Sequence, residues 1–481
     1  MKRVSITLAA LLLLASSALS GDVNGWKKRT VYQLLTDRFW RSNGDTSGCD
    51  LHNYCGGDHA GIINQMQYIK DLGFDAIWIS PVVDNIAGGY HGYWAANWEK
   101  INSHFGDEKQ LKTMVDYAHS QGIWVMVDVV ANHVGPVEHD YNQIYPLNRP
   151  EHYHTDCDIN DWNNQWQVEN CRLARLPDLD QSNSFVRSYL KDWIKNLVQK
   201  YGFDGIRIDT IPEVPKDFWA EYGQSAGVFQ MGECFNGNDA YVGPYQDVVT
   251  GLFNYPMYYT IRDVWMYGRS MRMIADRWNT NGQHFKDLDA LGIFVDNHDN
   301  ARFLNGNGDK RLFKSALTFA LTARGIPFFY YGSEQGFAGG NDPFNREYMW
   351  RNFDRNNELF KFIQTLNKAR TAQGVVHNAF AEKWVDDTLY AFTRGKFFVA
   401  LTNQVNGQVH QDVPNTGFSE GETVCNIFFS GDCVKITGGK LPVYLSNGEA
   451  KVFVPKTSSF FVGVYPEADP ATVEGETLML E

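Results

Sequence analysis

Eight short runs of β-branched, aromatic and other apolar residues recur along the chain, and they constrain its fold more than any other feature. They lie at residues 30–35, 76–80, 124–130, 205–209, 228–232, 248–253, 292–296 and 327–331. Nearly continuous apolar strands separated by amphipathic segments are typical of a parallel sheet covered by helices. Eight of them predict an α/β protein built on a closed (β/α)8 TIM barrel. The sixth run is the weakest strand prediction, because Gly251 interrupts it.

The spacing of the runs also predicts how the chain divides. Residues 133–180, between the third and fourth runs, are too many for a βα loop and are rich in Asn, Asp, His and Trp, so they indicate an inserted subdomain. The barrel then comprises 21–132 and 181–375, with a helix at 184–201 that stops at Gly202. Short strand-like runs follow between Gly, Asn and Pro turns, and they predict a C-terminal antiparallel β domain over 376–465. These runs lie at 388–394, 397–403, 451–454 and 459–464.

The two ends of the chain differ from the rest in composition. Lys2 and Arg3 precede an apolar stretch and then small residues, which predicts a signal peptide over 1–20 and a secreted, extracellular protein. No later apolar run reaches the roughly 18 residues of a membrane helix, so no membrane partner is expected. Residues 466–481 form an acidic tail without a strong pattern.

Charge and aromatic content narrow the class of partner. The formal net charge is −13, which argues against nucleic acid and anionic membranes as partners. A neutral polymer such as a glucan is compatible with this charge, and the 14% aromatic content suits stacking against sugar rings.

Seven cysteines in an exported chain predict disulfides with one cysteine left over. The short separations favour the pairs Cys49–Cys55, Cys157–Cys171 and Cys425–Cys433. Cys234 then remains unpaired, and we expect it to act as a small buried apolar residue.

Three acidic residues, Asp209, Glu233 and Asp299, each end a short apolar run. Any one of them alone could cap the following helix, but three together favour catalysis, because a parallel barrel carries its chemistry at the carboxyl ends of its strands. A retaining glycosidase needs two such carboxylates, one as nucleophile and one as proton donor. Arg207 lies two residues before Asp209 and therefore points to the same side, where its charge can hold the nucleophile ionised.

Several motifs in order resemble those of α-amylases of glycoside hydrolase family 13, and the pattern is most similar to the secreted fungal-type enzymes. The resemblance covers essentially the whole mature chain. The motifs are LLTDRF at 34–39, YCGG at 54–57, YHGYW at 90–94, DVVANH at 128–133, LPDLD at 176–180, GIRID at 205–209, GE at 232–233, NHDN at 297–300 and GGNDP at 339–343.

The resemblance implies a role for each matching residue. Asp209 is expected to be the nucleophile, Glu233 the general acid and base, and Asp299 the group that stabilises the oxocarbenium-like transition state. The residues implied to bind substrate are His91, Tyr93, Trp94, His133, Arg207, Glu213, His298, Asp342 and Arg346.

The resemblance also implies a Ca²⁺ site in the inserted subdomain. Its expected ligands are Asn132, Glu169, Asp178 and the backbone carbonyl of Glu213. Hard oxygen ligands of this kind suit Ca²⁺ better than a transition metal.

One departure from the family pattern keeps a second function open. Family members usually carry Lys-His after the nucleophile, where this chain has Pro212 and Glu213. A Glu at this position is similar to the neopullulanase and cyclomaltodextrinase branch, whereas LPDLD at 176–180 is α-amylase-like. We therefore expect a monomeric endo-α-amylase acting on starch or glycogen, with a family 13 transglycosylase or neopullulanase-like enzyme as the alternative. A catalytically inactive glucan-binding protein is the remote alternative.

Overall fold

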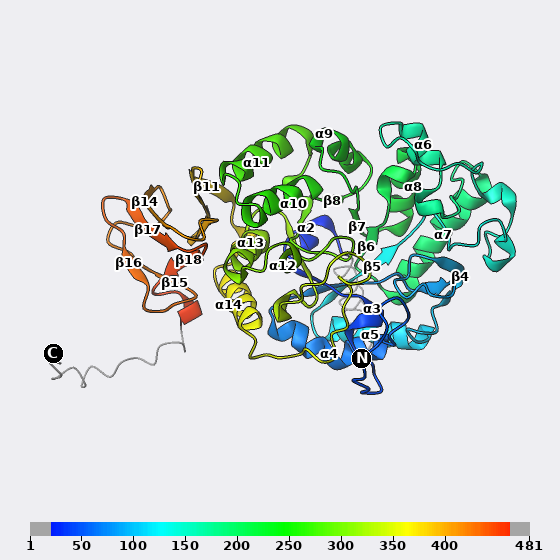
Figure 1. Ribbon diagram of the computed structural model, residues 1–481, viewed down its shortest axis with the longest axis horizontal. Coiled ribbons are helices and arrows are strands. Elements are labelled where there is room, and N and C mark those ends of the chain that lie inside the picture. The colour runs from blue at the N-terminus through cyan, green and yellow to red at the C-terminus, as the bar shows by residue number, and fades with distance from the viewer. Residues whose placement is uncertain (1–20, 462–481) are drawn as a thin grey trace, which may run out of the picture.

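The computed structural model describes residues 21–461, and within it eight parallel strands close into a barrel (Figure 1). Around the barrel the strand order is β1-β10-β9-β8-β7-β6-β5-β2. The strands are β1 Val31–Gln33, β2 Ala76–Ile79, β5 Trp124–Val129, β6 Gly205–Ile208, β7 Phe229–Gly232, β8 Gly251–Phe253, β9 Leu291–Ile293 and β10 Ile326–Tyr330. Each falls largely within one of the eight apolar runs, so the predicted (β/α)8 fold is confirmed. The signal-peptide and acidic-tail predictions, at 1–20 and 466–481, lie outside the described residues.

Helices surround the barrel, and their apolar faces pack on it (Figure 1). The longer ones are α4 His59–Asp71, α5 Glu108–Ser120, α7 Ser184–Tyr201, α8 Lys216–Ala226, α11 Arg272–His284, α13 Lys310–Thr322 and α14 Glu358–Ala372. The α7 boundaries match the prediction, because the Asn183 side chain accepts hydrogen bonds from the first turn and Gly202 ends the helix at φ 79°. Between residues 21 and 461, no helix is long and apolar enough to cross a membrane.

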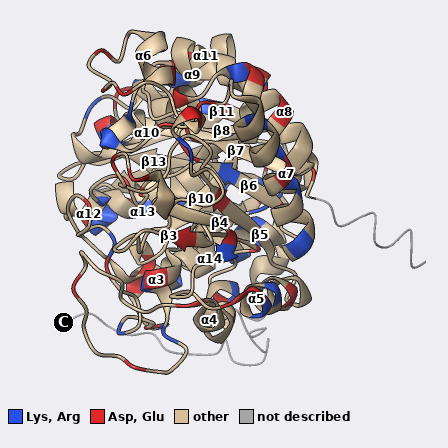
Figure 2. Cartoon of the chain, turned by 90° about the vertical axis from the view of Figure 1, so that its right-hand side faces the viewer, with Lys and Arg blue, Asp and Glu red and all other residues tan. Residues whose placement is uncertain are grey.

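Acidic and basic residues are interspersed over the outer helices (Figure 2). Surface ion pairs join neighbouring helices. Lys200 on α7 lies 2.7 Å from Glu108 on α5, and Lys191 on α7 lies 2.6 Å from Glu221 on α8. Exposed pairs of this kind each contribute about 1 kcal/mol or less, so the helices are held mainly by the buried apolar surface.

Two segments depart from the simple strand–helix alternation. β3 (Val83–Asn85) and β4 (Ala95–Ile101) form an antiparallel pair beside the barrel. The segment 133–180, which we predict as a subdomain, contains the short helix α6 (Gln165–Asn170). It returns to the barrel through a bridge between His133 and Asp178.

The predicted C-terminal β domain is confirmed as an antiparallel six-stranded sheet, with a second sheet of two strands. It lies beside α13 and α14 (Figure 1). The order of the larger sheet is β11-β12-β13-β18-β15-β16, and β14 pairs with β17. The strands are β11 Phe380–Val385, β12 Leu389–Arg394, β13 Phe397–Thr402, β14 Gln408–Pro414, β15 Thr423–Asn426, β16 Cys433–Lys435, β17 Lys440–Ser446 and β18 Ala450–Pro455.

One strand prediction in this domain is wrong. The described part of the run 459–464 is a 3-10 helix, Ser459–Phe461. The Ser458 hydroxyl accepts a hydrogen bond from the Phe460 backbone N–H at 3.1 Å, and the Ser458 carbonyl accepts one from the Phe461 N–H at 3.0 Å. This local turn competes with strand pairing and buries both phenylalanines.

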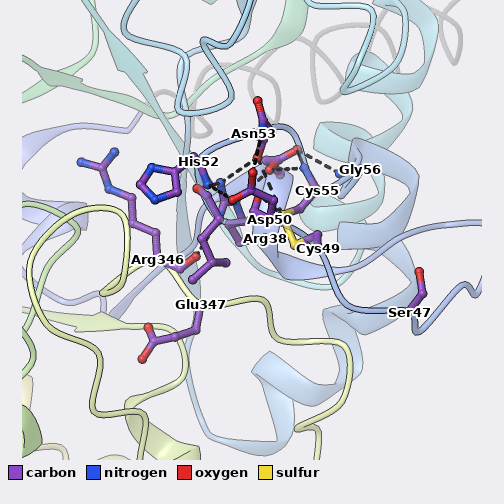
Figure 3. The surroundings of a disulfide bond; sticks show 12 residues. Arg38, Ser47, Cys49, Asp50, His52, Asn53, Cys55, Gly56, Arg346 and Glu347 are labelled. Carbon is purple, nitrogen blue, oxygen red and sulfur yellow. Dashed lines mark hydrogen bonds and ion pairs between the residues drawn. A yellow bond between two sulfur atoms is a disulfide. The ribbon is translucent and has the colours of Figure 1, made fainter.

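All three predicted disulfides are present, and Cys234 is free and buried among the described residues. The Cys49–Cys55 bridge closes a loop that is held by the buried Arg38 (Figure 3). The Arg38 guanidinium donates to the carbonyls of Leu51 and Asn53 in that loop, and to the carbonyl of Arg346 at 2.9 Å. The loop is thereby tied to the segment that follows β10.

Candidate active site

The three predicted carboxylates meet at the carboxyl end of the barrel. Asp209 directly follows β6, Glu233 directly follows β7, and Asp299 lies in the segment after β9. All three line one cavity of about 490 Å³. The other residues lining it are Tyr93, Trp162, Leu173, Thr210, Glu213 and Phe235.

Strand pairing fixes the first two carboxylates side by side. Ile208 at the end of β6 is in register with Gly232 at the end of β7, and the Glu233 N–H donates to the Ile208 carbonyl at 2.9 Å. A Cβ atom at Gly232 would lie 2.0 Å from the Ile211 side chain, so only glycine permits this close approach. The chain after β6 can therefore turn across the end of β7.

Arg207 joins Asp209 to Glu233. One terminal nitrogen, Nη1, lies 2.7 Å from Asp209 Oδ1, and the other, Nη2, lies 2.8 Å from Glu233 Oε2. The guanidinium is 1% exposed, so these contacts are made away from bulk water, where charge-assisted hydrogen bonds are strong. The sequence predicts the contact with Asp209, and the structure adds the contact with Glu233.

Asp128 is a buried member of the site to which the sequence analysis assigns no role. It lies in β5, and its carboxylate accepts from Arg207 at 3.0 and 3.1 Å and from the Tyr93 hydroxyl at 2.6 Å. Burial raises the pKa of Asp128 to about 7 in spite of Arg207, which lowers it. Asp128 orients the guanidinium and the tyrosine. Its position inside the DVVANH motif at 128–133 is the only sequence signal for it.

The environment of Glu233 favours its protonated form. Burial, and then the charges of Asp299 and Asp209, raise the pKa of Glu233 well above its ordinary value, and Arg207 opposes them. The Tyr255 hydroxyl lies 3.3 Å from Glu233 Oε1 and in turn accepts from Asn297 at 2.9 Å. A carboxyl group that keeps its proton beside ionisable neighbours is suited to general acid catalysis.

Neutral histidines surround the carboxylates. His298 Nε2 lies 2.6 Å from the Tyr93 hydroxyl, and its Nδ1 lies 2.8 Å from Gln33. Burial lowers the pKa of His298, His133 and His91, so the imidazoles can exchange hydrogen bonds with sugar hydroxyls without carrying charge. His133 Nε2 is buried with no hydrogen-bond partner among residues 21–461.

The aromatic pair of the YHGYW motif is split between two positions. The Tyr93 ring stacks on His298, with centroids 5.5 Å apart, and it lines the cavity. The Trp94 ring instead meets the edge of His91 at 4.9 Å. Only Tyr93 of this pair therefore faces the carboxylates directly.

Asp342 and Arg346 lie on the Asp299 side of the site. Arg346 Nη1 lies 3.0 Å from Asp342 Oδ1, and its Nη2 lies 3.5 Å from Asp299 Oδ1. The Tyr90 hydroxyl lies 3.2 Å from Asp342 and completes this group. Arg346 therefore holds a predicted binding residue and a predicted catalytic residue together.

Oxygen atoms converge where the segment 133–180 meets the barrel. One terminal atom of the Asn132 amide faces Asp178 Oδ1 at 3.0 Å and the Glu213 carbonyl at 3.1 Å. If nitrogen occupies this position, it donates two hydrogen bonds. If oxygen occupies it, three oxygens meet without a proton between them, and a hard cation would satisfy all three. The predicted ligands Asn132, Asp178 and Glu213 therefore fit calcium.

Glu169, the remaining predicted calcium ligand, is connected through Gln165 to Pro212, the residue before Glu213. The Gln165 amide donates to Glu169 Oε1 at 2.9 Å and to the Pro212 carbonyl at 3.0 Å. Asp178 also lies 2.6 Å from His154 through its other oxygen. No cluster of three or more His, Cys, Asp or Glu side chains suited to a metal occurs in residues 21–461, and two of the converging oxygens come from an amide and a backbone carbonyl.

Glu213 also lines the cavity that holds the three carboxylates. Its Oε2 atom is buried with no hydrogen-bond partner among the described residues. Burial, and then the nearby Asp209, raise the pKa of Glu213 to about 8. The position where the family pattern has a His therefore carries a carboxyl group that favours its neutral form.

Comparisons with known proteins agree with this geometry. A family model described as the catalytic domain of alpha amylase matches residues 33–413. An alpha-amylase of Saccharomycopsis fibuligera is 36% identical over 461 residues, which cover 90% of this chain and 92% of that protein. A beta/alpha-amylase of Paenibacillus polymyxa is 40% identical over 457 residues, or 89% of this chain but 38% of that protein. The solved structure of an alpha-amylase from Malbranchea cinnamomea superposes with a TM-score of 0.87 at 36% identity, covering 92% of this chain and 99% of that one.

Proposed function

The chain belongs to the α-amylase family of glycoside hydrolases, and from this membership we propose that it is a secreted, calcium-binding endo-α-amylase that hydrolyses α-1,4-glucosidic bonds of starch or glycogen with retention. The observation that carries the proposal is the contact of Arg207 with both Asp209 and Glu233 inside one cavity. Three disulfides support the extracellular assignment, because such bonds persist in oxidising compartments.

In the proposed reaction, an Asp209 oxygen attacks the anomeric carbon while Glu233 gives its proton to the departing glycosidic oxygen. The C–O bond to the leaving sugar breaks as the bond to Asp209 forms, which gives a covalent glycosyl-enzyme. Glu233, now ionised, takes a proton from water, and the resulting hydroxyl displaces Asp209. The Arg207 guanidinium donates a hydrogen bond to Asp209 at 2.7 Å, and burial favours protonated Glu233.

The surrounding residues are proposed to bind the sugars on either side of the cleaved bond. Asp299 accepts hydrogen bonds from sugar hydroxyls and stabilises positive charge as it develops, while Tyr93 offers a ring face. Asp342 and Arg346 bind the sugar on the non-reducing side. His91, Trp94, His133 and His298 complete the binding set.

Calcium is proposed to join the segment 133–180 to the barrel. Asn132 follows β5, Asp178 ends the inserted segment, and the Glu213 carbonyl follows β6, so one cation would connect three separate parts of the chain. Glu169 is proposed as a fourth oxygen ligand, because Gln165 binds both Glu169 and the Pro212 carbonyl. The cation would supply structural support and would take no part in bond cleavage.

A second candidate is a transglycosylase, or a neopullulanase-like or cyclomaltodextrinase-like enzyme, and the Glu213 carboxyl group favours it. Glu213 lines the cavity together with Trp162 and Phe235. The family pattern implies that this position contacts the leaving group. A neutral acid and two aromatic rings would hold an acceptor sugar and keep water out. Analysis of the products from soluble starch, maltotriose and pullulan, with the anomer resolved by NMR, separates the two candidates.

The pH profile tests the assignment of Glu233. Because Glu233 must be protonated to act as the acid, activity is retained below its pKa and is lost as pH rises through it. Tyr255→Phe removes a donor that favours the charged form, so the alkaline limb of kcat/KM is expected to move upward by up to about one pH unit. Tyr258→Phe, a neighbouring tyrosine that makes no contact with Glu233, is the control. An unchanged limb in Tyr255→Phe would remove Glu233 from this role.

Replacing the reacting carboxylates tests the mechanism. Glu233→Gln and Asp209→Asn are each expected to lower hydrolysis by several orders of magnitude, since general acid catalysis alone contributes about 10²–10⁴-fold and the covalent route contributes more. Circular dichroism and thermal melting should show an intact fold. Near-normal rates in either purified variant would contradict its assigned role.

Chelation tests the calcium site. EDTA is expected to lower the Tm, and added Ca²⁺, but not Mg²⁺, to restore it, because a ligand that binds only the folded state stabilises by RT ln(1 + [L]/Kd). Asp178→Asn should weaken the dependence on calcium concentration. A melt unchanged by chelator, with no metal detected in the protein, would contradict the site.

The double variant Pro212→Lys/Glu213→His tests the departure from the family pattern. A lost charge-assisted hydrogen bond to a leaving-group sugar is worth about 1.5–3 kcal/mol, so the parent should cleave maltotriose poorly. The variant should shift the products of maltotriose to maltopentaose toward those of relatives that carry the Lys-His pair. Identical product ratios in variant and parent would show that these positions do not set specificity.

A further inference from the structure

A second cavity, of about 630 Å³, lies at the opposite end of the barrel from the carboxylates. It is lined by residues that precede β1, β9 and β10, and by the start of the β domain. Lys27 and Lys28 come before β1, Asp289 comes before β9, and Arg324 comes before β10. Arg394, at the end of β12, closes the cavity from the β-domain side.

Cations outnumber anions in this cavity, although the whole chain carries a formal charge of −13. Its lining includes two lysines and two arginines against a single carboxylate, Asp289. Asp289 is paired with Arg324, whose Nε and Nη2 atoms donate to its two carboxylate oxygens at 2.8 and 3.3 Å. Lys27 is paired with Asp287 at 2.5 Å.

Lys28 and Arg394 are left without a carboxylate. Within residues 21–461, neither makes an ion pair. Lys28 is exposed, and Arg394 donates only to backbone carbonyls, from Nη1 to Ala323 at 2.9 Å and from Nε to Asn378 at 3.0 Å. The remaining Nη2 group of Arg394 is therefore free to bind a ligand.

The charges around Arg394 repel one another. Burial, together with the neighbouring Arg324, lowers the pKa of Arg394, although Asp289 opposes this. Burial, and then Arg394, lower the pKa of Arg370 to about 10. Arg370 is itself buried, and its Nε atom has no hydrogen-bond partner in the described chain. A bound anion would relieve this repulsion.

We propose that this cavity binds a tetrahedral oxyanion, either free or as the phosphate ester of a sugar, between Lys28, Arg324 and Arg394. Guanidinium groups present N–H donors in a planar fork that matches phosphate and sulfate oxygens. The volume leaves room for a sugar beside the anionic group. Because Arg394 belongs to the β domain and Lys28 and Arg324 to the barrel, the anion would connect the two.

The test uses the full chain with calcium present and sulfate as the probe, because phosphate would compete for the calcium. At constant ionic strength set with sodium chloride, sulfate is expected to raise the Tm in a saturable way, and calorimetric titration should give one site. Lys28→Gln should weaken sulfate binding about fivefold and Arg394→Gln at least about tenfold. Lys109→Gln, which removes another exposed lysine remote from the cavity, is the matched control and should bind as the parent does.

The outcomes are distinct. Glucose 6-phosphate that binds more tightly than sulfate would identify a sugar-phosphate site, and equal affinities would identify a site for the free oxyanion. No saturable effect beyond chloride, or equal weakening in Lys28→Gln and Lys109→Gln, would overturn the proposal. Lys28→Gln should leave the hydrolysis rate unchanged, because the cavity lies at the other end of the barrel. Failure here would therefore leave the proposed function untouched.

Discussion

The buried guanidinium of Arg207 is the interaction on which the site depends. Asp128, Asp209 and Glu233 all contact it, and none of them could stay charged in this position without a cation. One cation cannot fully offset three carboxylates at low dielectric, so at least one of them favours its proton. Burial raises the pKa of Glu233 well above its ordinary value, so the proton is favoured on Glu233. Burial also raises the pKa of Asp128. The proposed nucleophile and the proposed acid therefore share one guanidinium, and burial raises the pKa of Glu233 in spite of it.

The parallel strands explain why three carboxylates lie around one guanidinium. The carboxyl ends of β5, β6 and β7 lie side by side in register, so each strand brings its acidic residue to the same place. The close contact of Gly232 with Ile211 then lets the chain after β6 lie across β7. The same turn brings the Glu213 carbonyl to the Asn132 amide, and Glu213 also lines the cavity. A change at the proposed calcium site would therefore reach the cavity through Glu213.

Sequence patterns predicted the barrel and the positions of Asp209 and Glu233. Burial on both faces makes each barrel strand apolar, so an acidic residue at the end of a strand is easily recognised in the sequence. The role of Asp128 was not predicted, because this residue lies inside its strand. Its role follows only from its contacts with Arg207 and Tyr93, which the sequence does not reveal. The segment 459–464 has a strand-like composition, but Ser458 forms a local turn at its start. The contact of Arg346 with Asp299 joins residues far apart in the chain, and no local pattern carries such information.

The opposite charges at the two ends of the barrel have a common origin in the helices. Each helix that follows a barrel strand begins near the carboxyl end of the sheet and ends near its amino end. The helix dipoles therefore place partial positive charge at the carboxyl end of the barrel and partial negative charge at its amino end. Carboxylates are therefore favoured at the carboxyl end of the barrel and cations at its amino end. Arg394 shows this directly, since it donates to the carbonyl of Ala323, the C-cap residue that follows α13. An anion at this end cannot replace those carbonyl contacts without cost, so it must bind to the guanidinium N–H groups that the helix leaves unused.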